Sequence, residues 1–122
     1  GPFAWPVRGK VLSSYGPKAD GLHNDGINIA ARKGEPVKAA QNGVVAYVGD
    51  QIQGFGNLIL LRHEDRYMSA YGHLDKISVT KGQVIQKGQA IGQAGMTGNV
   101  DTPQLHFEIR RGTKALNPQK YL

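Results

Sequence analysis

Short segments in which apolar and polar residues alternate run along the chain and predict β-strands. Gly26–Ala30 alternates in this way, and so does Gln104–Arg110 near the C-terminus. Gly43–Gly49 and Leu58–Leu61 are apolar on both faces, as buried strands are, and Tyr67–Gly72 completes the set. No segment keeps a 3.6-residue apolar period for three turns, so no long helix is expected.

Three copies of a Lys-Gly-polar-x-apolar pattern predict tight turns that lead into short strands. They begin at Lys33, Lys81 and Lys87, and their glycines can adopt a positive φ without steric cost. With 17 glycines in 122 residues, the pattern predicts an all-β fold with a folded-over, barrel-sandwich-like antiparallel sheet and a groove. No linker divides the chain, so we expect one domain over residues 3–122, with Gly1-Pro2 as the scar of a cleaved tag.

Composition narrows the choice of function. The chain has no cysteine, which excludes disulfides and thiolate metal sites. No apolar run approaches the roughly 18 residues that span a bilayer, so this domain is not expected to insert into a membrane. The formal net charge of +6 suits an anionic partner such as a cell-wall polymer. The positive residues are dispersed along the sequence without interleaved aromatic residues, so nucleic-acid binding is not expected.

Four histidines are the side chains best suited to chemistry near neutral pH: His23, His63, His73 and His106. In the strand Gln104–Arg110, alternation sends Leu105, Phe107 and Ile109 to the core and places Gln104, His106 and Glu108 on the opposite face. An exposed polar residue on a half-buried strand is the competing interpretation for His106. His73 follows the strand that ends at Gly72 and is expected in a loop, whereas His63 is expected to be structural.

The chain resembles the lysostaphin/LytM-type zinc peptidases over nearly its whole length. The resemblance rests on the order and spacing of Phe3-x-Trp5-Pro6-Val7-x-Gly9, Gly26-Ile27-Asn28-Ile29-Ala30, Gly54-Phe55-Gly56-Asn57, Tyr71-Gly72-His73-Leu74 and Leu105-His106-Phe107-Glu108. It implies the antiparallel fold of that family. Among the members, the chain is most similar to those that act as cell-division factors.

The resemblance also implies that most of a zinc site is missing. The three positions that ligate zinc in active members fall on Asn24, Asn28 and His106, and the two assisting histidines fall on His73 and Gln104. Amides are weak zinc ligands compared with imidazole and carboxylate, and Gln104 cannot accept a proton. We therefore expect a degenerate domain with only vestigial metal and catalytic positions, no bound metal or other cofactor, and no enzymatic activity.

Two alternatives remain open at this stage. His23 and Asp25, one residue out of register, could swing inward and rebuild an active zinc-dependent peptidoglycan endopeptidase. The triplet Asp75-Lys76-Ile77 is loosely similar to the lysine hairpin of lipoyl carrier domains.

The resemblance favours a non-catalytic regulator of peptidoglycan hydrolysis. Such a protein would work in the periplasm at the division site, where it would bind and activate a peptidoglycan amidase. Its binding cleft, open to the amidase or to peptidoglycan itself, would be formed by the residues around the former zinc site: Asn24, Asn28, His73, Gln104, His106 and Glu108.

Overall fold

The computed structural model describes residues 1–122, which form twelve β-strands and three 3-10 turns of three residues each. The strands are β1 (Val11–Ser13), β2 (Gly16–Pro17), β3 (His23–Asn24), β4 (Ile27–Ala30), β5 (Pro36–Lys38), β6 (Gly43–Gly49), β7 (Asn57–Arg62), β8 (Tyr67–Ile77), β9 (Val84–Ile85), β10 (Ala90–Ala94), β11 (Gln104–Arg111) and β12 (Lys114–Leu116). The 3-10 turns are η1 (Ala19–Gly21), η2 (Glu64–Arg66) and η3 (Pro118–Lys120). No helix is long and apolar enough to cross a membrane.

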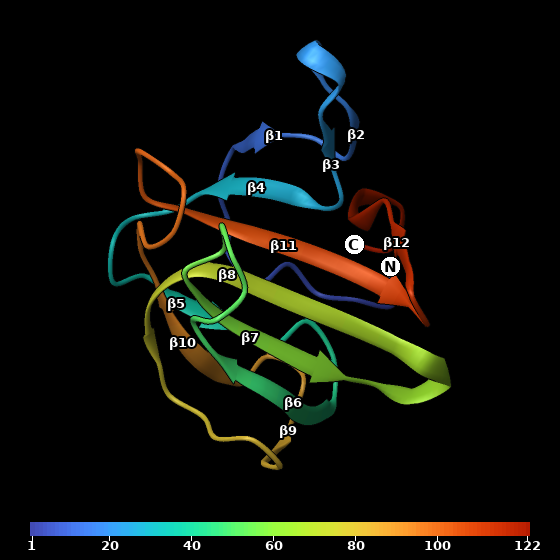
Figure 1. Ribbon diagram of the computed structural model, residues 1–122. Coiled ribbons are helices and arrows are strands. Elements are labelled where there is room, and N and C mark those ends of the chain that lie inside the picture. Colours follow the sequence, from blue (N-terminus) through green and yellow to red (C-terminus); the bar gives the residue numbers. More distant parts are fainter.

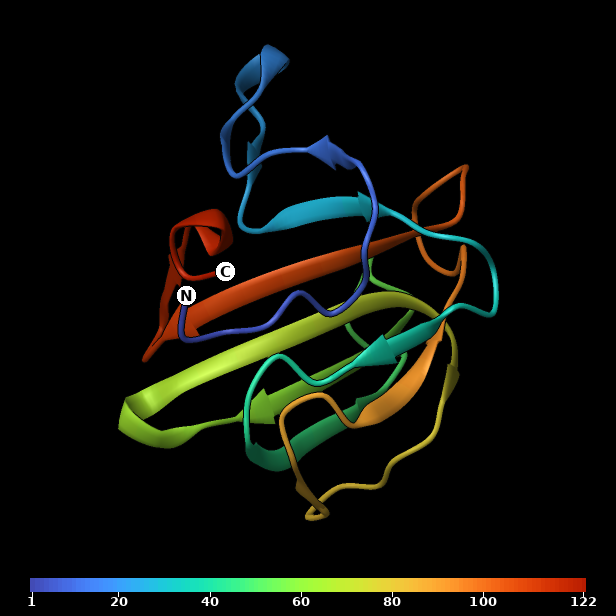
Figure 2. The same cartoon turned by 180° about the vertical axis from the view of Figure 1, so that it is seen from behind.

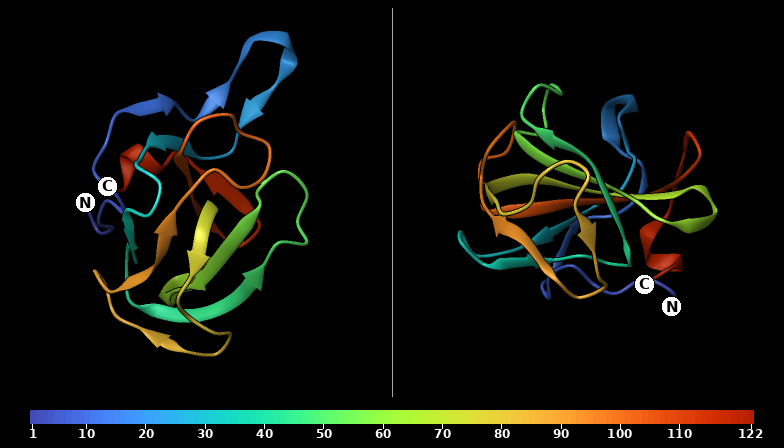
Figure 3. Two further views of the ribbon diagram at one scale, coloured as in Figure 1. Left: turned by 90° about the vertical axis from the view of Figure 1, so that its left-hand side faces the viewer. Right: turned by 90° about the horizontal axis from the view of Figure 1, so that it is seen from below.

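The antiparallel sheet has the strand order β1-β4-β11-β8-β7-β6-β9 and continues from the end of β8 into β10 and β5 (Figure 1). Seen from behind, β5 and β10 lie across the back of the longer strands (Figure 2). The short hairpin of β2 and β3 forms a separate two-stranded sheet that stands away from the body (Figure 3). The predicted all-β antiparallel fold is confirmed.

One hydrophobic core lies between the two layers. Leu105 and Phe107 of β11 point into it from the long strands, and Val37 of β5 and Ile91 of β10 close it from the other side. All four side chains are completely buried. Because side chains alternate along a strand, the residues between them point outward, away from the core, on two opposite surfaces of the domain.

Strand β8 joins the two layers by changing partners at His73. Up to Gly72 it pairs with β11, where Gly72 lies opposite His106, and from Leu74 onward it pairs with β10. His73 itself has a φ of +64°, in the left-handed region that a non-glycine residue adopts at a cost of roughly 1–2 kcal/mol. The expectation that the strand ends at Gly72 and leaves His73 in a loop is therefore wrong. The pairing continues past a local kink that apolar alternation does not reveal.

The three Lys-Gly turns are confirmed and share one hydrogen-bond pattern. Gly34, Gly82 and Gly88 have φ values of 90°, 90° and 86°, as the third residue of a type II turn requires. In each turn, the side-chain Oε1 of the residue after glycine accepts a hydrogen bond from the backbone N–H of the first residue of the turn. Each turn also forms two backbone hydrogen bonds with one residue of a neighbouring strand or its end: Ala94, Val45 and Ala39. Lys76, by contrast, lies within β8 opposite Gln93 and not at a hairpin tip, which contradicts the lipoyl alternative.

His63 is part of a buried chain of hydrogen bonds at the far end of β7. Its Nδ1 lies 2.6 Å from the carbonyl oxygen of Asn42, and its Nε2 lies 2.7 Å from Ser69 Oγ. Ser69 Oγ in turn lies 2.7 Å from the hydroxyl of Tyr71, which accepts the N–H of Ala40. The carbonyl oxygen of Asn42 requires hydrogen on Nδ1, and the hydroxyl of Ser69 can donate to Nε2 of the neutral ring. Burial lowers the pKa of His63, and the hydrogen bond to Asn42 offsets this only in part.

This lowered pKa predicts a loss of stability in mild acid. The unfolded chain, with an ordinary histidine pKa of 6.5, binds more protons than the folded chain below about pH 6.5. The contribution of His63 is therefore complete above that pH and is lost as the pH falls. We expect the urea midpoint to drop between about pH 7.5 and 5, and to drop less in His63→Gln. The exposed His23→Gln serves as the control. Equal pH dependence in wild type and His63→Gln would contradict the assignment.

Candidate functional site

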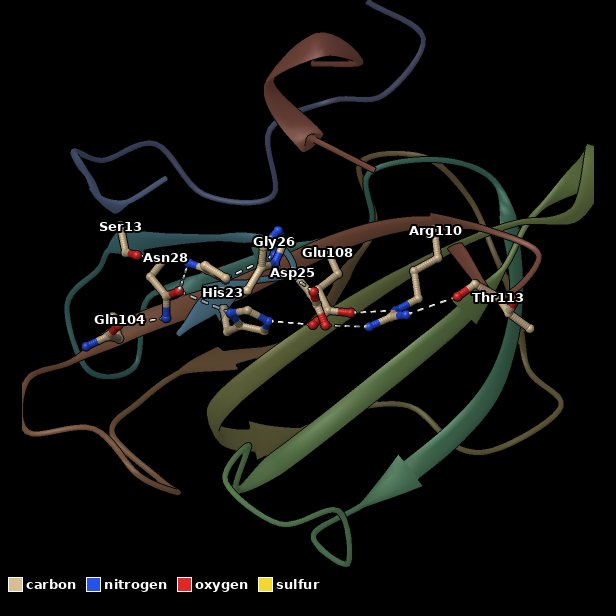
Figure 4. A network of polar contacts seen from close by, with 11 residues as sticks. Ser13, His23, Asp25, Gly26, Asn28, Gln104, Glu108, Arg110 and Thr113 are labelled. Atoms are coloured by element: carbon tan, nitrogen blue, oxygen red, sulfur yellow. Dashed lines mark hydrogen bonds and ion pairs between the residues drawn. The ribbon is translucent and has the colours of Figure 1, made fainter. Parts of the chain in front are cut away.

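The predicted site residues gather on the outer face of β4 and β11, away from the core. Strand pairing aligns Ser13 of β1, Asn28 of β4, His106 of β11 and Gly72 of β8 in one row across the sheet. Contacts between side chains extend this row into a continuous line of polar groups (Figure 4). The line consists of Ser13, Asn24, Asn28, Gln104, His106, Glu108, Arg110 and Asp25. The structure therefore brings together residues that are 78 positions apart in the sequence.

The amide groups in this line are oriented by backbone groups at both ends. Asn24 Oδ1 accepts the backbone N–H of Gly26 at 3.0 Å, which directs its Nδ2 toward Asn28 Oδ1 at 3.0 Å. At the other end, Gln104 Nε2 donates to the carbonyl oxygen of Thr102 at 3.3 Å, and its Oε1 accepts from Asn28 Nδ2 at 2.9 Å. Both constraints agree on the orientation of Asn28, whose Oδ1 faces the imidazole of His106.

Both ring nitrogens of His106 consequently face acceptors. Nδ1 lies 3.1 Å from Asn28 Oδ1, and Nε2 lies 2.7 Å from Glu108 Oε2. Only the doubly protonated ring satisfies both contacts, because an amide oxygen and a carboxylate cannot donate. Both ring nitrogens are thus engaged by groups of the chain.

Glu108 anchors the charged end of the line. It is almost fully buried and also accepts from Arg110 Nε at 2.7 Å, while Arg110 Nη2 reaches Asp25 Oδ2 at 3.4 Å. Burial acts to raise the pKa of Glu108, but the hydrogen bonds and charges of His106 and Arg110 outweigh it, so the pKa lies below its ordinary value. The carboxylate is thus ionised and paired on both oxygens.

His73 contributes a different group to the same surface. Its backbone N–H donates to the carbonyl oxygen of Phe55 at 2.7 Å, and its Nδ1 lies 2.8 Å from the carbonyl oxygen of Thr97. Nδ1 therefore carries the hydrogen, and Nε2 keeps a lone pair that no group of the chain uses. Burial lowers the pKa of His73, the bond to Thr97 raises it, and the nearby His106 lowers it again, with a net decrease. The ring is neutral at neutral pH.

The line is partly covered and has open space at both ends. Phe55 stacks at a tilt on His106, with ring centroids 5.1 Å apart, so that His106 is only 6% exposed. A depression of about 400 Å³ lies beside Gln104, and a smaller one of about 180 Å³ lies beside Glu108 and Arg110. The two largest cavities, of about 570 and 430 Å³, lie elsewhere, around His63.

The residues at the three zinc positions do not fit a zinc ion. Asn24 donates to Asn28 Oδ1, and His106 Nδ1 lies 3.1 Å from the same oxygen. The three side chains therefore contact one another, and both ring nitrogens of the one retained histidine are engaged within the chain. Zinc needs imidazole nitrogen or carboxylate oxygen from about three residues. No group of three or more histidine, cysteine, aspartate or glutamate residues is placed to hold a metal.

His23 and Asp25 do not swing in to rebuild the site. His23 Nδ1 lies 3.1 Å from Asp25 Oδ1, and its ring packs edge-on against Tyr15 in the exposed hairpin. Sequence reasoning missed two members of the line. Ser13 accepts from Asn24 at 2.9 Å, and Arg110 ties Glu108 to Asp25. The alternation of β11 places Arg110 on the site face, but nothing in the sequence indicates the pairing of β1 with β4.

Comparison with known proteins gives a consistent result. The sequence profile of peptidase family M23 matches residues 22–118. Over 110 residues the chain is 47% identical to the cell division protein DipM of Caulobacter vibrioides, covering 90% of this chain and 18% of DipM. Over 120 residues it is 44% identical to the murein hydrolase activator NlpD of Escherichia coli K12, covering 98% of this chain and 31% of NlpD. The chain thus spans less than a third of either relative.

Solved structures of peptidases share the fold. The catalytic domain of the antimicrobial peptidase lysostaphin from Staphylococcus simulans superimposes with a TM-score of 0.84 at 32% identity, covering 92% of this chain and 90% of that domain. The catalytic domain of a mutant of the prophage-encoded M23 protein EnpA from Enterococcus faecalis gives a TM-score of 0.85 at 30% identity, with 96% of each chain covered.

The shared acceptor of Asn28 predicts a measurable contribution to stability. Asn28→Ala removes the acceptor for Asn24 and His106 and the donor to Gln104, which leaves partly buried polar groups without partners. We expect a loss of about 1–3 kcal/mol in the free energy of unfolding, measured by urea denaturation. Asn99→Ala is the matched control, because Asn99 is exposed and its side chain forms no hydrogen bond within the chain. Equal effects of the two substitutions would show that the line is not a stabilising unit.

Proposed function

The chain belongs to peptidase family M23, and from this premise we propose that it is a non-catalytic member that activates cell-wall hydrolases. The observation that carries the proposal is the direct bonding of Asn24, Asn28 and His106 to one another. Where active relatives would hold zinc, this domain has a closed set of hydrogen bonds. In addition, Gln104 stands where a catalytic histidine is expected and cannot act as a base.

The names of the relatives support an activating role. NlpD is named a murein hydrolase activator, DipM is named a cell division protein, and further relatives are named lipoproteins. We infer that the partner is a peptidoglycan amidase, and that the domain, comprising residues 3–122, works in the periplasm at the division site.

The cleft around the former zinc site is the proposed docking surface. Its six residues are Asn24, Asn28, His73, Gln104, His106 and Glu108. Most of their hydrogen-bonding capacity is used within the chain, but the second Nδ2 hydrogen of Asn28 and the Nε2 lone pair of His73 remain. A neutral donor and a neutral acceptor suit the peptide groups of a partner segment.

Release of dye from labelled peptidoglycan, with zinc supplied throughout, tests the proposal. We expect no release by the domain alone, slow release by a division amidase alone, and faster release by the two together. Release by the domain alone that a chelator abolishes would mean that it is an active zinc-dependent endopeptidase. Activation that fails with every division amidase of the host would also overturn the proposal.

Positive charge beside the cleft predicts a salt-dependent association. Arg110 is one-third exposed and borders the cleft, and Arg111 follows it at the exposed end of β11. We expect Arg110→Gln/Arg111→Gln to weaken binding to the amidase more at low salt than at high salt, because screening reduces the contribution of exposed charges. Lys114→Gln/Lys120→Gln is the control. Calorimetry or biosensor titration at two salt concentrations would show whether the two double variants differ.

A further inference from the structure

The net charge of the domain is concentrated in three segments of the chain. Residues 6–10, 32–38 and 75–90 contain eight of the 15 basic residues and two of the nine acidic residues. The excess of basic over acidic residues in these segments equals the whole formal net charge of +6. The rest of the chain has seven basic and seven acidic residues. All eight basic residues are exposed.

Strand pairing brings these segments onto one surface, which we call the basic face. Lys38 on β5 lies opposite Ala90 on β10, and Lys76 at the end of β8 lies opposite Gln93 on β10. The backbone N–H of Lys38 donates to the carbonyl oxygen of Pro6 at 3.0 Å, which holds the chain at Pro6 alongside β5, whereas Lys10 accepts from Ala30 at the end of β4. Lys38 and Lys76 therefore lie on either side of β10.

The Lys-Gly turns add to the same face. The turn with Lys33 is bonded to Ala94 at the end of β10, and the turn with Lys87 is bonded to Ala39 directly after β5. In each turn lysine is the second residue, next to a glycine with positive φ, and its side chain is exposed. A repeated turn thus presents a repeated positive charge.

The basic face lies on the opposite side of the domain from the cleft. Val37 and Ile91 point from β5 and β10 into the core, and Leu105 and Phe107 point into the same core from β11. Alternation then directs Lys38 outward on one surface and His106 outward on the other. Figures 1 and 2 show β5 and β10 in a layer behind β7 and β8, which continue the sheet from β11.

We propose that the basic face binds peptidoglycan through the free carboxylates of its stem peptides. The three segments contain no aromatic residue, and Trp5, which directly precedes the first of them, is a single exposed ring. The face therefore has neither the row of aromatic residues on which nucleic-acid bases stack nor the aromatic belt of a membrane interface. Among the exposed large apolar side chains of the domain, only Val84 lies in the three segments. Flexible lysines spread over a β-surface suit a polymer with spaced negative charges.

The inference rests on the proposed function in one respect, the envelope location that brings the domain to the wall. It gives the two faces separate tasks. The basic face holds the domain on the wall while the cleft, on the other side, stays free to engage the hydrolase. An activator held in this way would deliver its partner to its substrate.

Co-sedimentation of the 122-residue chain with purified sacculi tests the inference. We expect binding at low salt, release at high salt, and a loss of roughly tenfold or more in affinity for Lys38→Glu/Lys76→Glu. A second pair, Lys33→Glu/Lys87→Glu, should lose binding in the same way, so that the result does not depend on the folding of one variant. Lys114→Glu/Lys120→Glu, in the charge-balanced part of the chain, should bind like wild type.

Three results would overturn the inference. Both basic-face pairs could bind sacculi as wild type does, sacculi with amidated carboxylates could still bind the domain, or the domain could bind anionic lipid vesicles and not sacculi. Amidase activation on soluble glycan-peptide fragments separates this inference from the proposed function. There the basic-face pairs should activate as wild type does, since no wall anchoring is needed. Loss of activation in that assay would mean that the basic face contacts the amidase instead.

Discussion

Burial of β11 on both faces is the constraint from which the rest of the domain follows. From Gln104 to Ile109 every residue of this strand is buried. On the inner face the apolar side chains fill the core. On the outer face the polar side chains of Gln104, His106 and Glu108 are shielded from water, so each must find a partner within the protein. No buried side-chain nitrogen or oxygen lacks a hydrogen bond.

That requirement indicates how a domain of this family could lack zinc without leaving unpaired polar groups. A metal ion would satisfy the lone pairs of the side chains around it, and its removal would leave them unpaired. Here Asn28 replaces the ion as the common partner, since its Oδ1 accepts from Asn24 and His106. Glu108 remains bonded to His106, in the arrangement by which a carboxylate orients a metal-bound histidine. The geometry of the peptidase persists, although the bonds that hold it are different.

Two surfaces of the same thin domain therefore have different physical characters. Around the proposed cleft, the charges of Glu108 and Asp25 are both paired with Arg110, so little unpaired charge remains there. The opposite surface is exposed and carries an excess of positive charge. Recognition at the cleft depends on hydrogen-bond geometry and shape, whereas attraction at the basic face depends on charge and on salt. Two such surfaces on opposite sides would let one domain connect two partners.

The sequence alone determined the strands and the tight turns, and its resemblance to the zinc peptidases indicated which positions to compare with zinc ligands. These depend on local rules: alternation with a period of two, glycine with positive φ, and residue types at fixed spacings. Tertiary structure decided what depends on partners far along the chain. It showed that β8 continues through His73 by changing its partner strand, and that backbone groups fix the orientation of Asn28. It also brought Lys38 of β5 and Lys76 of β8 to the two sides of β10. Such features arise when strands pair, and pairing across tens of residues leaves no local trace.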